Sequence, residues 1–196
     1  MASTSPGTPD IAASDLESVW FNEPKRWKRV GTELHLTTNP QTDFWRHTHY
    51  GFVRDSGHLL GCRVPGDFVA SVQVHGEYRD QYDQAGLMVR LDAERWVKCG
   101  IEFVDGAASM STVVTHAVSD WSVTPLAAVP QWLGLRLTRS GDALKVEYSV
   151  DGGPWLMQRL AFLPPDLPVS VGPMAASPDG GGFDVQFRAL AVSPRG

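Results

Sequence analysis

The feature that most constrains the fold is a period of two in the apolar residues, repeated along most of the chain. In 68–74, for example, Phe68, Ala70, Val72 and Val74 alternate with other residues, the pattern of a strand with one buried face. Gly, Pro and Asp residues separate such runs at short intervals, and no segment sustains the period of an amphipathic helix. The sequence therefore predicts an all-β protein, with at most one short helical turn around 14–19.

Seven segments show this pattern most clearly, namely 68–74, 85–91, 96–104, 110–115, 132–138, 144–150 and 183–190. Five weaker candidates have the same alternation, namely 26–30, 33–37, 44–51, 155–161 and 169–175. Gly and Asp residues at 140–142 and 151–153 supply the backbone angles that tight hairpin turns require. About a dozen strands predict a sandwich of two large antiparallel sheets.

The length of 196 residues and the hydrophobic content of 42% suit one well-buried core, so we expect a single domain over 14–196. Residues 1–13 are rich in Ser, Thr, Pro and Ala and lack periodicity, which predicts a flexible N-terminal tail.

Charge and composition argue against several classes of partner. The formal net charge is -5 and no basic stripe is present, so we expect no nucleic-acid partner. No apolar run is long enough to span a bilayer, so no membrane association is expected. Two cysteines, Cys62 and Cys99, are too few for a disulfide framework, and we expect a cytoplasmic protein with reduced thiols.

Three strings carry a resemblance to a known family, namely Thr42-Asp43-Phe44-Trp45-Arg46-His47-Thr48-His49-Tyr50-Gly51, Tyr82-Asp83-Gln84-Ala85-Gly86-Leu87-Met88-Val89-Arg90 and Trp96-Val97-Lys98-Cys99-Gly100-Ile101-Glu102. In this order they resemble an uncharacterised family related to the fungal regulation-of-enolase protein. The resemblance covers about residues 20–192 and implies a concanavalin A-like jelly-roll β-sandwich. It implies no known reaction, and a fold alone hosts many functions.

Strand alternation sorts the side chains by face, because residues i and i+2 point the same way. The apolar residues of 85–91, 97–103 and 133–137 are assigned to the core. The opposite face then carries Gln84, Lys98, Glu102 and Arg136, with Trp96 and Trp132 at the strand edges. A concave sheet face with fixed polar groups and aromatic platforms suits a sugar, whose ring stacks on Trp and whose hydroxyls bind polar side chains.

The segment 43–50 is unusually dense in polar aromatic residues. Alternation would place Trp45, His47 and His49 on one face, and we take Trp45 and His49 as further ligand-binding candidates, together with Trp121. The two histidines lack a third ligand at metal-binding spacing, so no metal and no cofactor are predicted.

Three functions remain open. The first is a lectin-like binding module for a carbohydrate or other polyol-type small molecule, using the residues above. The second is a carbohydrate-active hydrolase with Glu102 as its catalytic carboxylate, which would need a second carboxylate such as Asp83 or Asp120 nearby. The third is a regulatory or protein-interaction domain, acting as a homodimer or with another protein.

Overall fold

The computed structural model describes residues 17–195, which form two seven-stranded antiparallel sheets and one short extra hairpin. In spatial order, the first sheet contains β1 (Ser18–Phe21), β6 (His58–Val64), β15 (Val169–Ala176), β8 (Gln84–Arg90), β9 (Arg95–Val104), β10 (Ala107–His116) and β11 (Val118–Pro125). The second contains β14 (Leu156–Phe162), β13 (Ala143–Val150), β12 (Leu133–Ser140), β7 (Asp67–Gly76), β16 (Asp184–Arg195), β3 (Glu33–Thr37) and β2 (Arg26–Val30). The predicted β-sandwich is confirmed.

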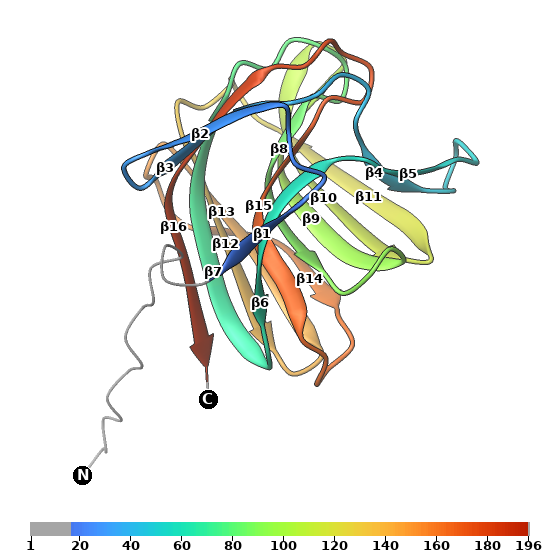
Figure 1. The fold of residues 1–196 in the computed structure, drawn as a ribbon, viewed down its shortest axis with the longest axis vertical. Coiled ribbons are helices and arrows are strands. Elements are labelled where there is room, and N and C mark those ends of the chain that lie inside the picture. The colour runs from blue at the N-terminus through green and yellow to red at the C-terminus, as the bar shows by residue number, and fades with distance from the viewer. Residues whose placement is uncertain (1–16, 196) are drawn as a thin grey trace.

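The extra hairpin consists of β4 (Phe44–Arg46) and β5 (Val53–Asp55) and belongs to neither large sheet. It projects beside β10 and β11 at the right of Figure 1, and β4 contacts β11. This hairpin lies on the side of the first sheet that faces away from the second sheet, which we call the outer face.

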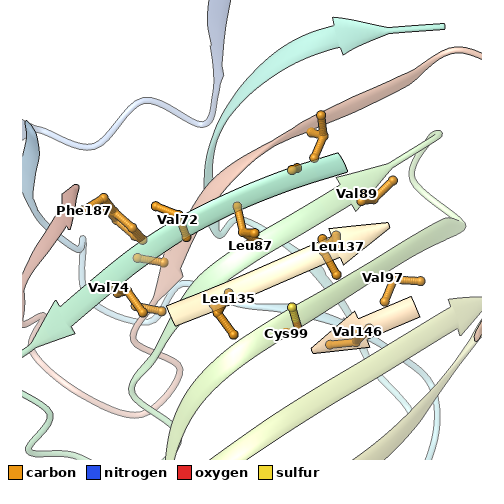
Figure 2. Close-up of a cluster of buried hydrophobic side chains, with 14 of the residues drawn as sticks. Val72, Val74, Leu87, Val89, Val97, Cys99, Leu135, Leu137, Val146 and Phe187 are labelled. Carbon is orange, nitrogen blue, oxygen red and sulfur yellow. The ribbon is translucent and has the colours of Figure 1, made fainter. Parts of the chain in front are cut away.

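The main core fills the space between the two sheets (Figure 2). Leu87 and Val89 of β8 and Val97 and Cys99 of β9 point toward the second sheet, as alternation predicts. The second sheet meets them with the inward residues of its central strands, Val72, Val74, Leu135, Leu137, Val146 and Phe187. The side chains named here are all apolar, so their removal from water stabilises the sandwich.

A second, smaller hydrophobic cluster lies on the outer face of the first sheet. Its buried members are Phe44, Trp45, Leu59, Met88, Trp96, Val113 and Met174. The hairpin thus covers side chains that alternation alone would leave in solvent, and every residue of β8 is buried. The first sheet is therefore covered on both faces around β8 and β9.

The sequence missed or misjudged several elements. Ser18–Phe21 is strand β1, so the predicted helical turn at 14–19 is wrong for residues 18 and 19. The rest of that turn before residue 17, and the predicted tail at 1–13, lie outside the described residues. Strands β6 and β11 were not predicted. Across residues 17–195 there is no helix with the length and apolar character needed to cross a membrane.

The predicted strand at 44–51 extends only over Phe44–Arg46. His47 and His49 have φ values of 59° and 65°, so the chain turns sharply there. The predicted alternation of Trp45, His47 and His49 onto one face is therefore wrong.

Candidate functional site

Two arginines hold the hairpin against the outer face. Arg90 of β8 donates two hydrogen bonds to the carboxylate of Asp55 on β5, at 2.8 and 2.9 Å. Arg46 of β4 forms an ion pair with Glu94 at 2.8 Å and also donates to the carbonyl of Ala117. The paired geometry of Arg90 and Asp55 fixes orientation as well as distance. The hairpin is thus a fixed wall of the site.

The site is a cavity of about 160 Å³ between this wall and the sheet. Gly86 of β8 and Gly100 of β9 stand opposite each other beneath it, so neither strand places a side chain between Lys98 and Glu102. A Cβ added to Gly86 would lie 1.9 Å from the carbonyl oxygen of Cys99, because the two backbones approach closely here. The lining consists of Asp43, Trp45, Tyr50, Phe52, Arg54, Tyr82, Gln84, Lys98, Glu102, Trp121, Pro178 and Asp179.

Lys98 organises one side of the cavity floor. Its ammonium group is buried and donates to the side-chain oxygen of Gln84 at 2.5 Å and to the carbonyl of Phe44 at 2.8 Å. It also contacts the carboxylate of Asp43 at 3.4 Å. The three donors of the ammonium group are therefore all engaged by the protein. Lys98 joins β9 to the start of the hairpin and compensates the charge of Asp43.

Glu102 occupies the other side of the floor and is only 6% exposed. One of its oxygens, Oε2, accepts hydrogen bonds from Ser111 Oγ at 2.6 Å and from Trp121 Nε1 at 2.8 Å. Burial raises the pKa of Glu102, and the charge of Lys98 together with these two hydrogen bonds opposes that rise. The carboxyl group is thus held in one orientation beneath the cavity.

Aromatic side chains from separate elements form the walls. Trp45 packs edge-on against Tyr50 and Trp121, with ring centres 5.8 and 6.5 Å apart, and Trp121 packs against Tyr82 at 6.2 Å. The hydroxyls of Tyr50 and Tyr82 lie 3.0 Å apart and are hydrogen-bonded, so each of the four side chains contacts the next. This hydrogen bond, together with partial burial, raises the pKa of Tyr50 to about 12, so its hydroxyl stays neutral.

These aromatic residues form what we call the aromatic ring, namely Trp45, Tyr50, Tyr82 and Trp121, with Phe52 stacked on Tyr50 at 5.3 Å. It stands above polar groups that the sheet holds in place. Such a combination can bind the flat face of a small molecule and hydrogen-bond its polar groups.

The structure brings together five of the eight ligand-site residues expected from the sequence, namely Gln84, Lys98, Glu102, Trp45 and Trp121. Trp96 does not line the cavity, because it is buried beneath the hairpin in the second hydrophobic cluster. His49 is exposed on the hairpin turn and packs edge-on against Tyr50, with ring centres 4.7 Å apart, but it does not line the cavity.

Arg136 was expected on the same face as Lys98 and Glu102, and that placement is wrong. It lies on β12 in the second sheet, where it pairs with Glu147 at 2.9 Å and covers the ring of Trp155 at 4.3 Å. Trp132 precedes the same strand and lies under Arg188. Alternation tells inward from outward residues, but it does not tell which sheet a strand joins.

Other lining residues come from loops that strand patterns do not reach. Tyr82 has a φ of 67° and Tyr50 lies in the hairpin turn, so neither follows a period of two. Asp83 and Asp120, considered as partners for Glu102, are elsewhere. Asp83 is buried and accepts a hydrogen bond from Ser177 Oγ, and Asp120 pairs with Arg159.

Within residues 17–195, no group of three or more His, Cys, Asp and Glu side chains is arranged to hold a metal ion. The two cysteines are both buried and unpaired. Cys99 lies in the main core, where burial raises its pKa to about 12.

Solved structures with this fold fall into two groups. A functionally unknown protein from Saccharomyces cerevisiae superposes with a TM-score of 0.87 at 42% identity, covering 91% of this chain and 97% of that one. More distant structures share the fold alone. The carbohydrate binding module CBM66 from Bacillus subtilis has a TM-score of 0.57 at 12% identity, covering 89% of this chain and 94% of that chain.

The second group also includes a xylan β-1,4-xylosidase from Bacillus halodurans, with a TM-score of 0.66 at 12% identity. This chain matches 32% of that enzyme's chain, over 82% of its own length. The sandwich is therefore an architecture found in carbohydrate-binding and glycosidase proteins.

Sequence comparison identifies relatives of higher identity and the family of the chain. It is 43% identical over 177 residues to Regulation of enolase protein 1 of Saccharomyces cerevisiae, covering 90% of this chain and 89% of that protein. An uncharacterized protein of Emericella nidulans is 28% identical over 172 residues, covering 82% of this chain and 86% of that protein. The family described as Protein of unknown function (DUF1349) matches residues 20–195. This protein therefore belongs to the DUF1349 family, as its sequence motifs indicated.

Proposed function

We propose that this protein is a lectin-like binding module whose ligand, a carbohydrate or other small polyol, occupies the cavity on the outer face. The observation that carries the proposal is the aromatic ring above a floor of buried polar groups. Sugars present apolar faces to aromatic rings and hydroxyls to carboxylates, so both parts of the site have a role. The cavity of about 160 Å³ is below the roughly 300–1,000 Å³ of sites for drug-sized ligands, which favours a ligand of one ring.

The distant structural relatives give this proposal further support. A carbohydrate binding module and a xylosidase contain the same sandwich. At 12% identity they show that this fold occurs in carbohydrate-binding and glycosidase proteins, and the cavity itself carries the argument for function.

A thermal-shift screen of monosaccharides, oligosaccharides and polyols tests the proposal. A ligand at a hundred times its Kd stabilises the folded state by about 2.7 kcal/mol. For a protein of this size the unfolding midpoint should rise by about 5–11 °C. Glu102→Gln should abolish the response because it changes the fixed carboxylate of the cavity floor.

The matched control is Glu147→Gln, the same substitution at a largely buried carboxylate on the second sheet. A sugar that stabilises wild type and Glu147→Gln but not Glu102→Gln supports binding in the cavity. A screen without any stabilising sugar, or a response equal in both variants, would rule this site out as a carbohydrate site.

A second candidate, a carbohydrate-active hydrolase, is favoured by one observation. Glu102 shares the cavity with two further carboxylates, Asp43 and Asp179, and burial raises the pKa of Glu102. A glycosidase needs one protonated carboxyl group as general acid and a second carboxylate as base or nucleophile. Release of nitrophenol from a panel of nitrophenyl glycosides would reveal it. Turnover that survives Glu102→Gln would exclude Glu102 as the acid.

A further inference from the structure

The polar groups of the cavity floor leave acceptors, not donors, available to a ligand, whereas Arg54 on the wall donates to the carbonyl of Pro178 and lies over the ring of Phe52. Lys98 uses its three donors on Gln84, Phe44 and Asp43. The amide group of Gln84 donates to the carbonyl of Tyr82 at 3.2 Å and lies 3.5 Å from Asp43. The most buried cation and the only amide side chain in the lining are therefore occupied by the protein itself.

The free polar atoms of the floor are carboxylate oxygens. Oε2 of Glu102 accepts both of its hydrogen bonds, and Oε1 has no hydrogen-bond partner among residues 17–195. Oδ1 of Asp43 accepts from the backbone of Phe44 at 2.7 Å, and within the same range Oδ2 has no partner. Both side chains line the cavity, and Glu102 is 94% buried, since 6% is exposed. A ligand in the cavity can therefore donate hydrogens to these oxygens.

The charges of the cavity do not cancel. Its lining holds three carboxylates, Asp43, Glu102 and Asp179, and two cations, Arg54 and Lys98. Lys98 is paired with Asp43. Among the described residues, no cation forms an ion pair with Glu102. A buried carboxylate without a counter-ion is costly, and a positively charged ligand would compensate it.

The walls suit the same charge. The faces of Trp, Tyr and Phe rings carry negative electrostatic potential and attract cations, and ammonium groups are recognised in proteins by cages of such rings. The four side chains of the aromatic ring line the same cavity as Glu102, and Trp121 also donates its indole N–H to that carboxylate. The aromatic walls and the carboxylates of the floor thus both favour a positively charged group of a ligand next to Glu102.

From this arrangement we infer that the ligand carries a protonated amine, whose ammonium group binds Oε1 of Glu102 inside the aromatic ring. The inference rests on the proposed function and narrows it to amino sugars and amine-bearing polyols. The amine donates its hydrogens to Glu102 and Asp43, while the sugar ring lies against the aromatic walls. Sugar phosphates are disfavoured, because the lining holds three carboxylates against two cations, and of those cations Lys98 has its donors already used.

Matched sugars that differ only in the amine test this inference. Glucosamine is compared with glucose and N-acetylglucosamine, and galactosamine with galactose and N-acetylgalactosamine. Titration calorimetry is done at about pH 6.5, below the roughly 7.7–8.0 typical of an α-amino group, so that the amines are protonated. The free amine should bind at least about tenfold more tightly than both neutral partners, as expected for compensation of a buried charge.

Two variants locate the effect. Glu102→Gln should bring the amine and neutral sugars to similar affinity, whereas Glu147→Gln, on the second sheet, should keep the preference. If the neutral sugars bind as tightly as the amines, or if Glu102→Gln keeps the preference, the inference is wrong while sugar binding stands. If neither the amine sugars nor the neutral sugars bind, both the proposed function and this inference are wrong.

Discussion

Replacement of Lys98 by Met should strongly destabilise the fold. Lys98 is 3% exposed, and the variant would leave Asp43 buried without its cation and the side-chain oxygen of Gln84 without its donor. Removal of one partner from a buried ion pair costs about 3–5 kcal/mol, because the remaining charge stays uncompensated. For a protein of this size, that loss lowers the unfolding midpoint by about 6–20 °C.

Urea unfolding of four proteins measures the effect, namely wild type, Lys98→Met, Asp43→Asn and the double variant. Because Asp43→Asn removes the charge that Lys98 compensates, the double variant should be more stable than Lys98→Met alone. Lys145→Met is the control. Lys145 lies 3.1 Å from Glu147, closer than Lys98 lies to Asp43, but it is 41% exposed. An exposed cation contributes about 0–1 kcal/mol to a pair, and Glu147 keeps its ion pair with Arg136, so this control should change little.

The comparison separates burial from distance. If Lys145→Met costs as much as Lys98→Met, burial of the Lys98 pair does not determine its energy. If the double variant is no more stable than Lys98→Met, the charge of Asp43 is not what Lys98 compensates. Either result would refute the description of the cavity floor given above.

Three further predictions concern single residues. Burial raises the pKa of Glu102 above the unfolded value of about 4.3, so the folded state binds a proton more tightly than the unfolded state does. The free energy of unfolding of wild type, relative to that of Glu102→Gln, should therefore fall as the pH rises above about 4.3. A difference between the two proteins that is independent of pH between about 4 and 7 would contradict the raised pKa. Cys62 and Cys99 are buried and have raised pKa values, so a thiol reagent should label the native protein only as fast as the protein unfolds. Rapid labelling of the folded protein would instead show that the thiols are accessible. Gly86→Ala should cost about 1–3 kcal/mol in urea unfolding, because its Cβ would overlap the carbonyl of Cys99, and an unchanged stability would argue against the close approach of β8 and β9.

The part of the site that could be predicted from sequence is the part built on regular strands. Alternation in β8 and β9 placed Gln84, Lys98 and Glu102 outward and Leu87 and Cys99 inward, and the structure agrees. This works because the side-chain period of a strand is two wherever the backbone stays extended.

The rest of the site depends on information that a local pattern lacks. The positive φ values of His47, His49 and Tyr82 interrupt alternation, so the positions of the loop aromatics do not follow from their spacing. Arg136 has the outward orientation that its strand predicts, but its strand joins the other sheet. Strand partnership is set by contacts between distant segments, and one sequence does not display them. The density of polar aromatic residues in 43–50 was the only signal for the hairpin's role.

The presence of two separate hydrophobic clusters divides the protein into parts of unequal cooperativity. The main core joins the two large sheets, whereas the hairpin is held by the smaller cluster, by its arginine contacts and by the polar contacts of Lys98. Local opening of 43–56 would expose only that smaller cluster, so it needs less free energy than global unfolding. Backbone amides of β4 and β5 should then exchange with solvent sooner than those of β8 and β12. A ligand that bridges the hairpin and the sheet would slow this exchange selectively. Amide exchange in β4 and β5 would therefore report whether the cavity is occupied.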